Sequence, residues 1–260
     1  MASFDPLAPG SAATLVLVGT RVSGMMLIAP SFATTVVPRL VRVAIVVLLT
    51  VLLQPAVLPL VTDPQLTLSA VATEALVGFA IGLGAAVIVG AAEMAGDVMA
   101  VQIGLSGSAI LDPVDTSAQL PVLGVLLRMF TIALLLTLDL HHVMLQAMAD
   151  SFSTLVPGSA VDAAGGLRSM VAVGSALFAI GIRFAAPVIA VVLLATIALA
   201  ILSRAAPQIN LISVSFPVQI AIGLFVLSAA LPAIGRTLQG WPSVYQDLLA
   251  RTGDGFVATP

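Results

Sequence analysis

Long apolar segments make up most of the chain and limit what it can fold into. We read six of them, namely Ala12–Ala29, Leu40–Val61, Leu66–Ala92, Pro121–Leu140, Leu167–Ser203 and Leu211–Ile234. About 20 apolar residues are enough to cross a bilayer as a helix, so Leu167–Ser203 has room for two helices. None of the segments alternates polar and apolar residues as the strands of an outer-membrane barrel do. The pattern predicts an all-α fold with six or seven apolar helices.

The composition places these helices in a membrane protein. Of the 260 residues, 60% are hydrophobic and 8% are charged, whereas soluble domains are about 25% charged. Too few polar side chains remain to cover a water-facing surface. The net charge of −3 provides no basic patch for a nucleic acid, and the chain has no cysteine for disulfides or thiolate metal sites. We therefore expect a membrane protein that binds no nucleic acid.

The sequence lacks the motifs of common enzymes, with no GxxxxGK[ST], HExxH or GxSxG pattern. We expect no catalytic residues, no cofactor and no enzymatic activity. The adjacent His141 and His142 point to different faces of a helix, and no cysteine or convergent carboxylate pair accompanies them in the sequence. We interpret both histidines as helix-end or interfacial residues and expect no metal site.

Prolines interrupt the apolar segments and indicate helices packed against other protein. Each removes a backbone donor and bends or breaks its helix, and five lie inside the segments, at Pro55, Pro59, Pro187, Pro217 and Pro232. Broken helices at membrane depth are tolerated only where protein or water surrounds the break. We therefore expect most of this surface to face other protein.

Small residues recur every four positions at Gly78, Gly82, Ala86 and Gly90 and line one face of a helix. Such a face lets another backbone approach closely. The approaching helix belongs either to this chain or to another subunit, and the sequence leaves both alternatives open.

Ionisable residues lie within or at the edges of the apolar segments, at Arg21, Glu74, Arg128 and Arg183. An arginine at the centre of a membrane helix costs roughly 2.5–3.5 kcal/mol on insertion scales. We therefore predict that Arg21 and Arg128 are each paired with a carboxylate or with helix-end carbonyls and are shielded from lipid. Neither membrane orientation satisfies the positive-inside rule, so we do not expect an ordinary threaded bundle.

A long polar segment, Gly96–Leu120, separates the third and fourth apolar segments. Connections longer than about 12–15 residues are uncommon and are often functional. This one mixes glycines with apolar side chains such as Leu105, Ile110 and Leu111. Such a segment can close a narrow pore and swing aside on its glycines. The alternative is a solvated connector between two helices.

Several strings together resemble the FliR family, the R subunit of the flagellar type III protein export gate, which has homologues in injectisomes. The resemblance extends roughly from Thr14 to Pro232. It rests on Val37-Pro38-Arg39-Leu40-Val41-Arg42, Gln102-Ile103-Gly104-Leu105-Ser106 with Asp112-Pro113, Arg204-Ala205-Ala206-Pro207-Gln208-Ile209-Asn210, and Ser215-Phe216-Pro217. The arginine–proline–glutamine–asparagine string is the most specific of these.

The resemblance implies helical hairpins with proline-kinked helices, packed into a hetero-oligomeric helical pore assembly. It implies a P-subunit-like half at about 1–160 and a Q-subunit-like half at about 167–260, divided near Val156–Gly166. The implied partners are P-type and Q-type gate subunits, other membrane proteins of the export apparatus, and unfolded protein substrates. The implied location is the bacterial inner membrane at the flagellar basal body, largely above the bilayer plane.

The resemblance also implies roles for particular residues. It assigns the plug of the closed pore to Gly104, Leu105, Ser106, Gly107, Ser108, Ala109, Ile110 and Leu111. We interpret a second set as a subunit interface or a hairpin tip, comprising Gly78, Gly82, Ala86, Arg204, Pro207, Gln208 and Asn210. For the last four, capping of a helical hairpin and contact with a neighbouring subunit remain equal alternatives.

Two other functions fit the kinked helices and the charges within apolar segments. One is a secondary transporter for a small solute, although we find no internal repeat around a midplane site. The other is a permease subunit of an ATP-driven transporter, which needs a coupling helix on a cytoplasmic loop. A transporter should purify well alone or as a homodimer, whereas a gate subunit should purify as a large hetero-oligomer with its partners.

Overall fold

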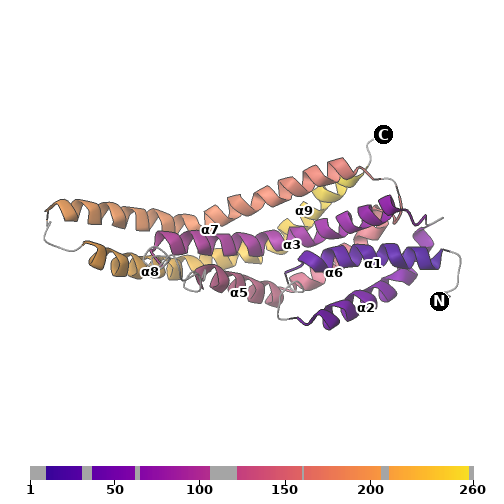
Figure 1. Ribbon diagram of the computed structural model, residues 1–260, viewed down its shortest axis with the longest axis horizontal. Helices are drawn as coiled ribbons and strands as arrows, with labels where there is room; N and C mark the ends of the chain where they lie inside the picture. Colours follow the sequence, from indigo (N-terminus) through magenta and orange to yellow (C-terminus); the bar gives the residue numbers. More distant parts are fainter. Residues whose placement is uncertain are drawn as a thin grey trace. The chain divides into compact units, whose positions relative to one another are not determined.

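The described residues of the chain fold into a series of helices (Figure 1). The computed structural model describes residues 10–30, 37–61, 65–105, 122–159, 161–205 and 211–257, without the side chains of 211–214. Every regular element in these ranges is a helix, which confirms the all-α prediction. The elements are α1 (Ser11–Ile28), α2 (Arg39–Val57), the 3-10 helix η1 (Leu58–Leu60), α3 (Leu68–Gln102), α5 (Val122–Thr137), α6 (Leu140–Thr154), α7 (Ala163–Ala205), α8 (Leu211–Gln239) and α9 (Trp241–Phe256).

Within the described residues, five helices are long and apolar enough to cross a membrane. They are α1, α2 with η1, α3, α7 and α8 from Ser215 onward. The bent pair of α5 and α6 makes a sixth if it forms one span. The sequence allows two helices in Leu167–Ser203, but α7 is a single helix of 43 residues. The higher of the two predicted helix counts is therefore wrong for this segment.

Helix boundaries from hydropathy are accurate for α1, α2, α5 and the start of α8, and α7 extends a few residues beyond the predicted Leu167–Ser203 at each end. The third apolar segment was expected to end at Ala92, but α3 continues to Gln102 through the polar Glu93 and Asp97. Two further helices, α6 and α9, were not predicted, because their polar faces lower the average hydropathy below that of a membrane segment. Apolar residues at helical spacing with polar residues between them are typical of a helix with one solvated face.

Of the two effects predicted for these prolines, bending or breaking a helix, a break occurs only at Pro59 in the described residues. Pro59 lies in η1, directly after the α-helical part of this segment ends at Val57. By contrast, α2 continues past Pro55, and α7 continues past Pro187. Likewise, α8 continues past both Pro217 and Pro232. A proline deletes one backbone hydrogen bond, and the bonds on either side of it keep these long helices continuous.

The chain forms two compact units. The first comprises residues 1–87, 135–175 and 241–260, which hold α1, α2, the first part of α3, α6 and α9. Within this unit α1 and α2 lie side by side (Figure 1). Its buried side chains include Leu17, Met25, Met148 and Tyr245. The Tyr245 hydroxyl donates a hydrogen bond to the Ile81 carbonyl at 3.0 Å. Burial raises the pKa of Tyr245, so the phenol stays protonated as this donor.

The second unit comprises residues 88–134 and 176–240. It holds the last part of α3, most of α5, the later part of α7, and α8. Its core includes Met99, Ile103, Leu127 and Val192. On α3 and α5 a close approach occurs between Gly96 and Gly124, because a Cβ on Gly96 would lie 2.6 Å from the Gly124 Cα. These two backbones can pack at this distance only because both positions are glycine.

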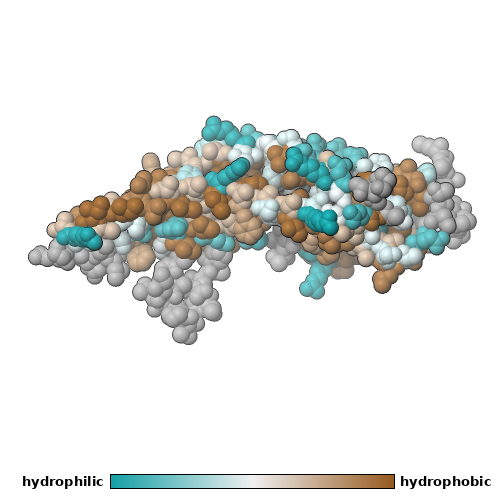
Figure 2. Space-filling model, turned by 90° about the horizontal axis from the view of Figure 1, so that it is seen from above, coloured by the Kyte–Doolittle hydropathy of each residue, from teal (hydrophilic) through white to brown (hydrophobic). Residues whose placement is uncertain are grey.

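Large apolar surfaces are left uncovered on three helices. In their most apolar 18-residue stretches, α2, α7 and α8 each bury only 17% of the residues, whereas α3 buries 67%. The exposed side chains include Leu40 and Leu52 of α2, Leu194 and Ile201 of α7, and Phe225 of α8. Apolar residues also cover much of the surface seen in Figure 2. A water-soluble monomer rarely exposes such patches, so lipid or partner subunits must cover these helices.

Candidate functional site

A buried charge cluster lies at the centre of the first unit. Arg21 is on α1, among the apolar residues Leu17, Val18 and Met25 of the same helix, and it is 1% exposed. Its Nε donates to Oε2 of Glu74 on α3 at 2.6 Å. Both side chains are removed from solvent, so this ion pair is not screened by water.

The remaining donors of Arg21 bind the end of α6. One terminal nitrogen donates to the Ser151 carbonyl at 3.0 Å and to the Ser151 hydroxyl at 3.1 Å. The other donates to the Leu155 carbonyl at 2.8 Å. The Ser151 carbonyl also accepts the N–H of Leu155 at 2.9 Å, so the guanidinium adds a second bond to it. The positive charge of Arg21 lies at the negative end of the α6 dipole, which stabilises it further. The guanidinium carbon also lies 4.4 Å from the centre of the Phe152 ring.

Glu74 extends the cluster to the connection between α6 and α7. Its second oxygen, Oε1, accepts the backbone N–H of Gly158 at 3.3 Å. Gly158 has a φ of 80°, a left-handed conformation that a side chain disfavours. The cluster therefore fixes α1, α3, the end of α6 and the segment that follows it. The prediction that Arg21 is paired with a carboxylate and with helix-end carbonyls, away from the surface, is confirmed.

Arg128 also has the predicted carboxylate partner, although the pair is looser. A terminal nitrogen of Arg128 on α5 lies 3.5 Å from Oε1 of Glu93 on α3. The two side chains are 33% and 34% exposed. Arg183 on α7 is exposed and lines a hollow of the second unit beside Pro187.

The small-residue face packs inside this chain at three of its positions, with Gly78 and Gly82 against α1 and Gly90 against the Leu177 side chain of α7. A Cβ on Gly82 would lie 2.7 Å from the Met25 carbonyl oxygen of α1. A Cβ on Gly78 would overlap the Arg21 backbone still more closely, and Gly24 of α1 in turn approaches the Ala75 carbonyl of α3. The close approach of α1 and α3 sets the Arg21–Glu74 distance. Ala86 is half-buried, and a contact of this face with another subunit stays a prediction.

The first predicted plug residue, Gly104, has a defined role at the end of α3. It has a φ of 80°, and its N–H donates to the Val101 carbonyl at 3.2 Å. The N–H of Leu105 donates to the Ala100 carbonyl at 3.0 Å. This pair of bonds around a left-handed glycine is a Schellman motif, which ends a helix and redirects the chain. Gly104 therefore places the start of the predicted plug.

The same end of α3 is held against α8 within the second unit. A Cβ on Gly104 would lie 2.8 Å from Cδ1 of Phe216, and Gly223 leaves room for the side chain of the buried Ile103. Phe216 and Gly223 are seven residues apart and so share one face of α8. Leu105 is 39% exposed. The other plug residues, Ser106, Gly107, Ser108, Ala109, Ile110 and Leu111, lie outside the described residues.

Most of the predicted hairpin tip between α7 and α8 lies outside the described residues. Arg204 lies in the last turn of α7 and is exposed. Pro207, Gln208 and Asn210 fall outside the described residues. A cation in the last turn of a helix interacts favourably with the helix dipole, which gives Arg204 one role at this end.

The two histidines lie at the start of α6, at a helix end as expected. The expectation of no metal site rested on the lack of a cysteine or a convergent carboxylate pair, and it did not consider the single carboxylate of Asp139. This residue is the N-cap of α6, and its carboxylate lies beside both imidazoles. The Asp-x-His-His spacing was the signal available, because one helical turn brings such residues together.

Comparisons with known proteins identify the family. Residues 12–241 match the family described as "Bacterial export proteins, family 1". "Flagellar biosynthetic protein FliR" of Pectobacterium carotovorum subsp. carotovorum is 30% identical over 233 residues, which cover 88% of each chain. The protein of that name from Escherichia coli K12 is 28% identical over 233 residues, again 88% of each chain. That of Bacillus subtilis 168 is 30% identical over 164 residues, 62% of this chain and 63% of the relative. The match over most of its length shows that this chain is a membrane protein of the FliR family of bacterial export proteins.

Proposed function

We propose that the chain is the R-type, pore-forming subunit of a flagellar type III protein export gate in the bacterial inner membrane. In this role it joins P-type and Q-type subunits at the flagellar basal body, next to the other membrane proteins of the export apparatus. Unfolded flagellar proteins then pass through the assembled pore. Family membership and the names of the relatives support the flagellar export role, and the surface of the helices supports the assembly.

The observation that carries the proposal is the length of the exposed apolar helices. With a rise of 1.5 Å per residue, the 43 residues of α7 extend over about 65 Å. The hydrocarbon core of a bilayer is only about 30 Å thick. Lipid tails cannot cover the whole length of such a helix. Partner subunits of the same helical kind would cover the remainder.

The buried cluster around Arg21 supports the same proposal. In a solute transporter, charged residues at membrane depth line the route of the substrate. Here the guanidinium and the Glu74 carboxylate are fully engaged inside the first unit and are closed to solvent. This pair therefore builds the fold of the subunit. A structural subunit needs such a fixed centre, whereas a transport site needs groups that can exchange partners.

We further propose the division into a P-subunit-like half, about 1–160, and a Q-subunit-like half, about 167–260. Gly158, near this boundary, is bound to Glu74 of the first half. The two compact units each contain residues from both sides of the boundary, so the halves would fold around one another as paired subunits do. The segment from Gly104 to Leu111 is proposed as the plug, with α3 and α8 holding its first residues.

Co-expression of the chain with its P-type and Q-type partners tests the proposal. A gate subunit should purify in mild detergent as one large hetero-oligomer and should be recovered poorly alone. A small-solute transporter or a permease subunit would instead be monodisperse alone or as a homodimer, with no P-type or Q-type subunit bound. Loss of flagellar protein secretion after deletion of the chain's gene, restored by the plasmid-borne gene, ties the complex to export.

A further inference from the structure

In place of the expectation from the sequence that His141 and His142 bind no metal, we propose that Asp139, His141 and His142 form a binding site for a late first-row divalent metal ion, with Zn²⁺ as the reference ion. The proposal rests on the geometry of these three side chains, on the backbone of Asp139 and on the chemistry of the donor atoms. It is independent of the export role. All three residues belong to the first unit, at the start of α6.

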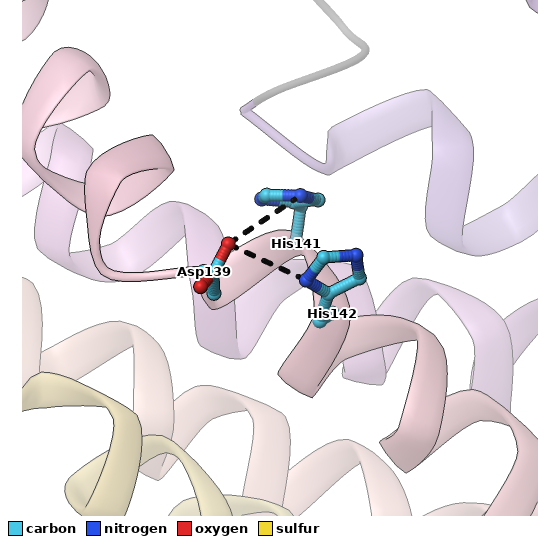
Figure 3. Close-up of side chains that lie close together, drawn as sticks. All are labelled: Asp139, His141 and His142. Atoms are coloured by element: carbon cyan, nitrogen blue, oxygen red, sulfur yellow. Dashed lines mark ion pairs between the residues drawn. The ribbon is translucent and has the colours of Figure 1, made fainter.

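The three possible ligand atoms converge on one point in front of the helix start (Figure 3). Oδ1 of Asp139 lies 3.4 Å from Nδ1 of His142 and 4.0 Å from Nε2 of His141. All three atoms lie within 4.8 Å of one another. Two ligands of a tetrahedral zinc ion are about 3.3 Å apart, given metal–ligand distances near 2.0–2.1 Å. His142 already meets this spacing, and a small side-chain rotation brings His141 to it.

Asp139 is held in an unusual backbone conformation that serves this arrangement. Its φ of 56° and ψ of 26° are left-handed, and it is the only non-glycine residue with a positive φ in the described part of the chain. An aspartate at this N-cap position ordinarily accepts a hydrogen bond from a free backbone N–H of the first turn. Asp139 makes no such side-chain cap. Its carboxylate lies against the imidazoles instead.

The nitrogen atoms of His141 are inequivalent, which selects one of them as a ligand. Nδ1 is buried and has no hydrogen-bond partner within the described residues, whereas Nε2 points toward Asp139. The two rings lie 4.2 Å apart at a tilt of 38°.

The donor set determines the class of metal. Two imidazole nitrogens and one carboxylate oxygen suit zinc, copper and nickel, while calcium and magnesium prefer sites made only of oxygen atoms. The chain has no cysteine, so no thiolate competes for the ion. The side chains of Asp139 and His142 are 70% and 65% exposed. The ion can therefore enter from solvent, and water or a partner residue can complete its coordination.

Metal titration of the full chain tests the proposal directly. The sequence contains only these two histidines and no cysteine, so background binding is low if the affinity tag contains no histidine. The chain is purified in mild detergent and titrated with Zn²⁺ against a chromophoric chelator. We expect one Zn²⁺ per chain. Titration with Cu²⁺ should give an electron paramagnetic resonance spectrum with nitrogen coupling from the imidazoles.

Three variants and one matched control locate the site. His141→Ala, His142→Ala and Asp139→Asn should each weaken Zn²⁺ binding at least about tenfold, since losing a ligand costs no less than losing a residue that orients one. Asparagine tolerates the left-handed conformation, so Asp139→Asn leaves the helix start intact. Asp150→Asn removes the same charge from an exposed position on α6 and should leave binding unchanged.

Two outcomes would overturn the site. One is the absence of stoichiometric Zn²⁺ binding to the folded wild-type chain. The other is unchanged affinity in His141→Ala and His142→Ala, which would place any bound ion elsewhere. Thermal unfolding of each variant without metal shows whether the fold is kept, and Asp139→Asn decides the question should either alanine variant unfold. The nitrogen coupling must disappear with the histidines for the proposal to stand.

Discussion

The Nε atom of Arg21 donates to Oε2 of Glu74 across 2.6 Å, and both side chains are almost completely buried. The two residues are 53 positions apart in the sequence and lie on different helices. An isolated charge in this position would be prohibitively expensive, so each residue is tolerated only because the other is present. The pair therefore acts as one unit that fixes α1 against α3.

The first prediction concerns loss of one charge from this pair. Glu74→Gln keeps the shape of the side chain but leaves the Arg21 cation buried without a counter-charge. We expect the variant to lose about 3–5 kcal/mol of unfolding free energy, as is usual when one partner of a buried pair is removed. Trp241 is the chain's only tryptophan and is 2% exposed in the same unit. Its fluorescence during thermal unfolding in detergent therefore reports the loss.

An exposed ion pair provides the control. Arg251 and Asp247 on α9 are one helical turn apart at 2.9 Å, and their side chains are 74% and 58% exposed. Asp247→Asn should cost less than about 1 kcal/mol, because water screens such a pair. The double variant Arg21→Met with Glu74→Met should recover part of the stability lost by Glu74→Gln. Equal unfolding temperatures for Glu74→Gln and Asp247→Asn would contradict the role of the buried pair.

The second prediction concerns the packing of α1 on α3. Gly82→Leu should separate these helices, because even a Cβ at this position lies 2.7 Å from the Met25 carbonyl oxygen. We expect a lower unfolding temperature and loss of the complex with P-type and Q-type subunits, measured by co-purification. Gly174→Ala, on α7, is the matched control, since nothing lies within 4 Å of a Cβ there. Normal yield of intact complex with Gly82→Leu would show that this contact is dispensable.

Gly104 supplies the third prediction. Gly104→Ala should destabilise the end of α3 for two separable reasons. A left-handed conformation costs a residue with a side chain about 1–2 kcal/mol, and the new Cβ meets Phe216. Adding Phe216→Leu relieves only the second cost, so the double variant should recover stability in part. Hydrogen exchange at the Leu105 amide, which is bonded to the Ala100 carbonyl, measures the opening of this cap. Unchanged hydrogen exchange at the Leu105 amide in Gly104→Ala would show that the glycine does not determine the stability of this helix end.

The sequence predicts the apolar helices and the need to pair Arg21, because both follow from the cost of exposing charge to lipid. It does not predict the partners. The carbonyls of Ser151 and Leu155 lie at the end of α6, and α6 itself is too polar to be recognised by hydropathy. Glu74 is recognisable as a buried carboxylate, but its choice of Arg21 depends on the contact between two helices.

Helix ends that depend on tertiary packing are likewise not predicted from hydropathy. The third apolar segment was expected to end at Ala92, yet α3 continues through Glu93 and Asp97 to Gln102, where the α5 backbone packs against it at Gly96. The Arg128 pair and the Gly124 contact both involve this extension. Asp139 was missed for a different reason. Its left-handed backbone is a local geometry that hydropathy does not report.

The fourth prediction tests the proposed plug. Ser106–Leu111 follows directly after the cap at Gly104, and deleting it keeps Gly104 and Leu105, which end α3. A narrow constriction lined with apolar side chains excludes water, so a plug made by this segment keeps the closed pore tight. We expect the deletion to leave the complex assembled but to make cells permeable to small solutes or ions. Solute uptake or membrane conductance measures the leak.

A variant of equal length separates the plug from a spacer. Replacing Ile110 and Leu111 with serine keeps the connection but removes its largest apolar side chains, so it should leak as the deletion does if these residues exclude water. Replacing Ser106 and Ser108 with alanine changes the same segment without removing apolar groups and should stay tight. A connector without a sealing role predicts tight membranes in all three strains, with at most an assembly defect. A tight membrane around fully assembled, loop-deleted complex would thus exclude the plug and leave the connector.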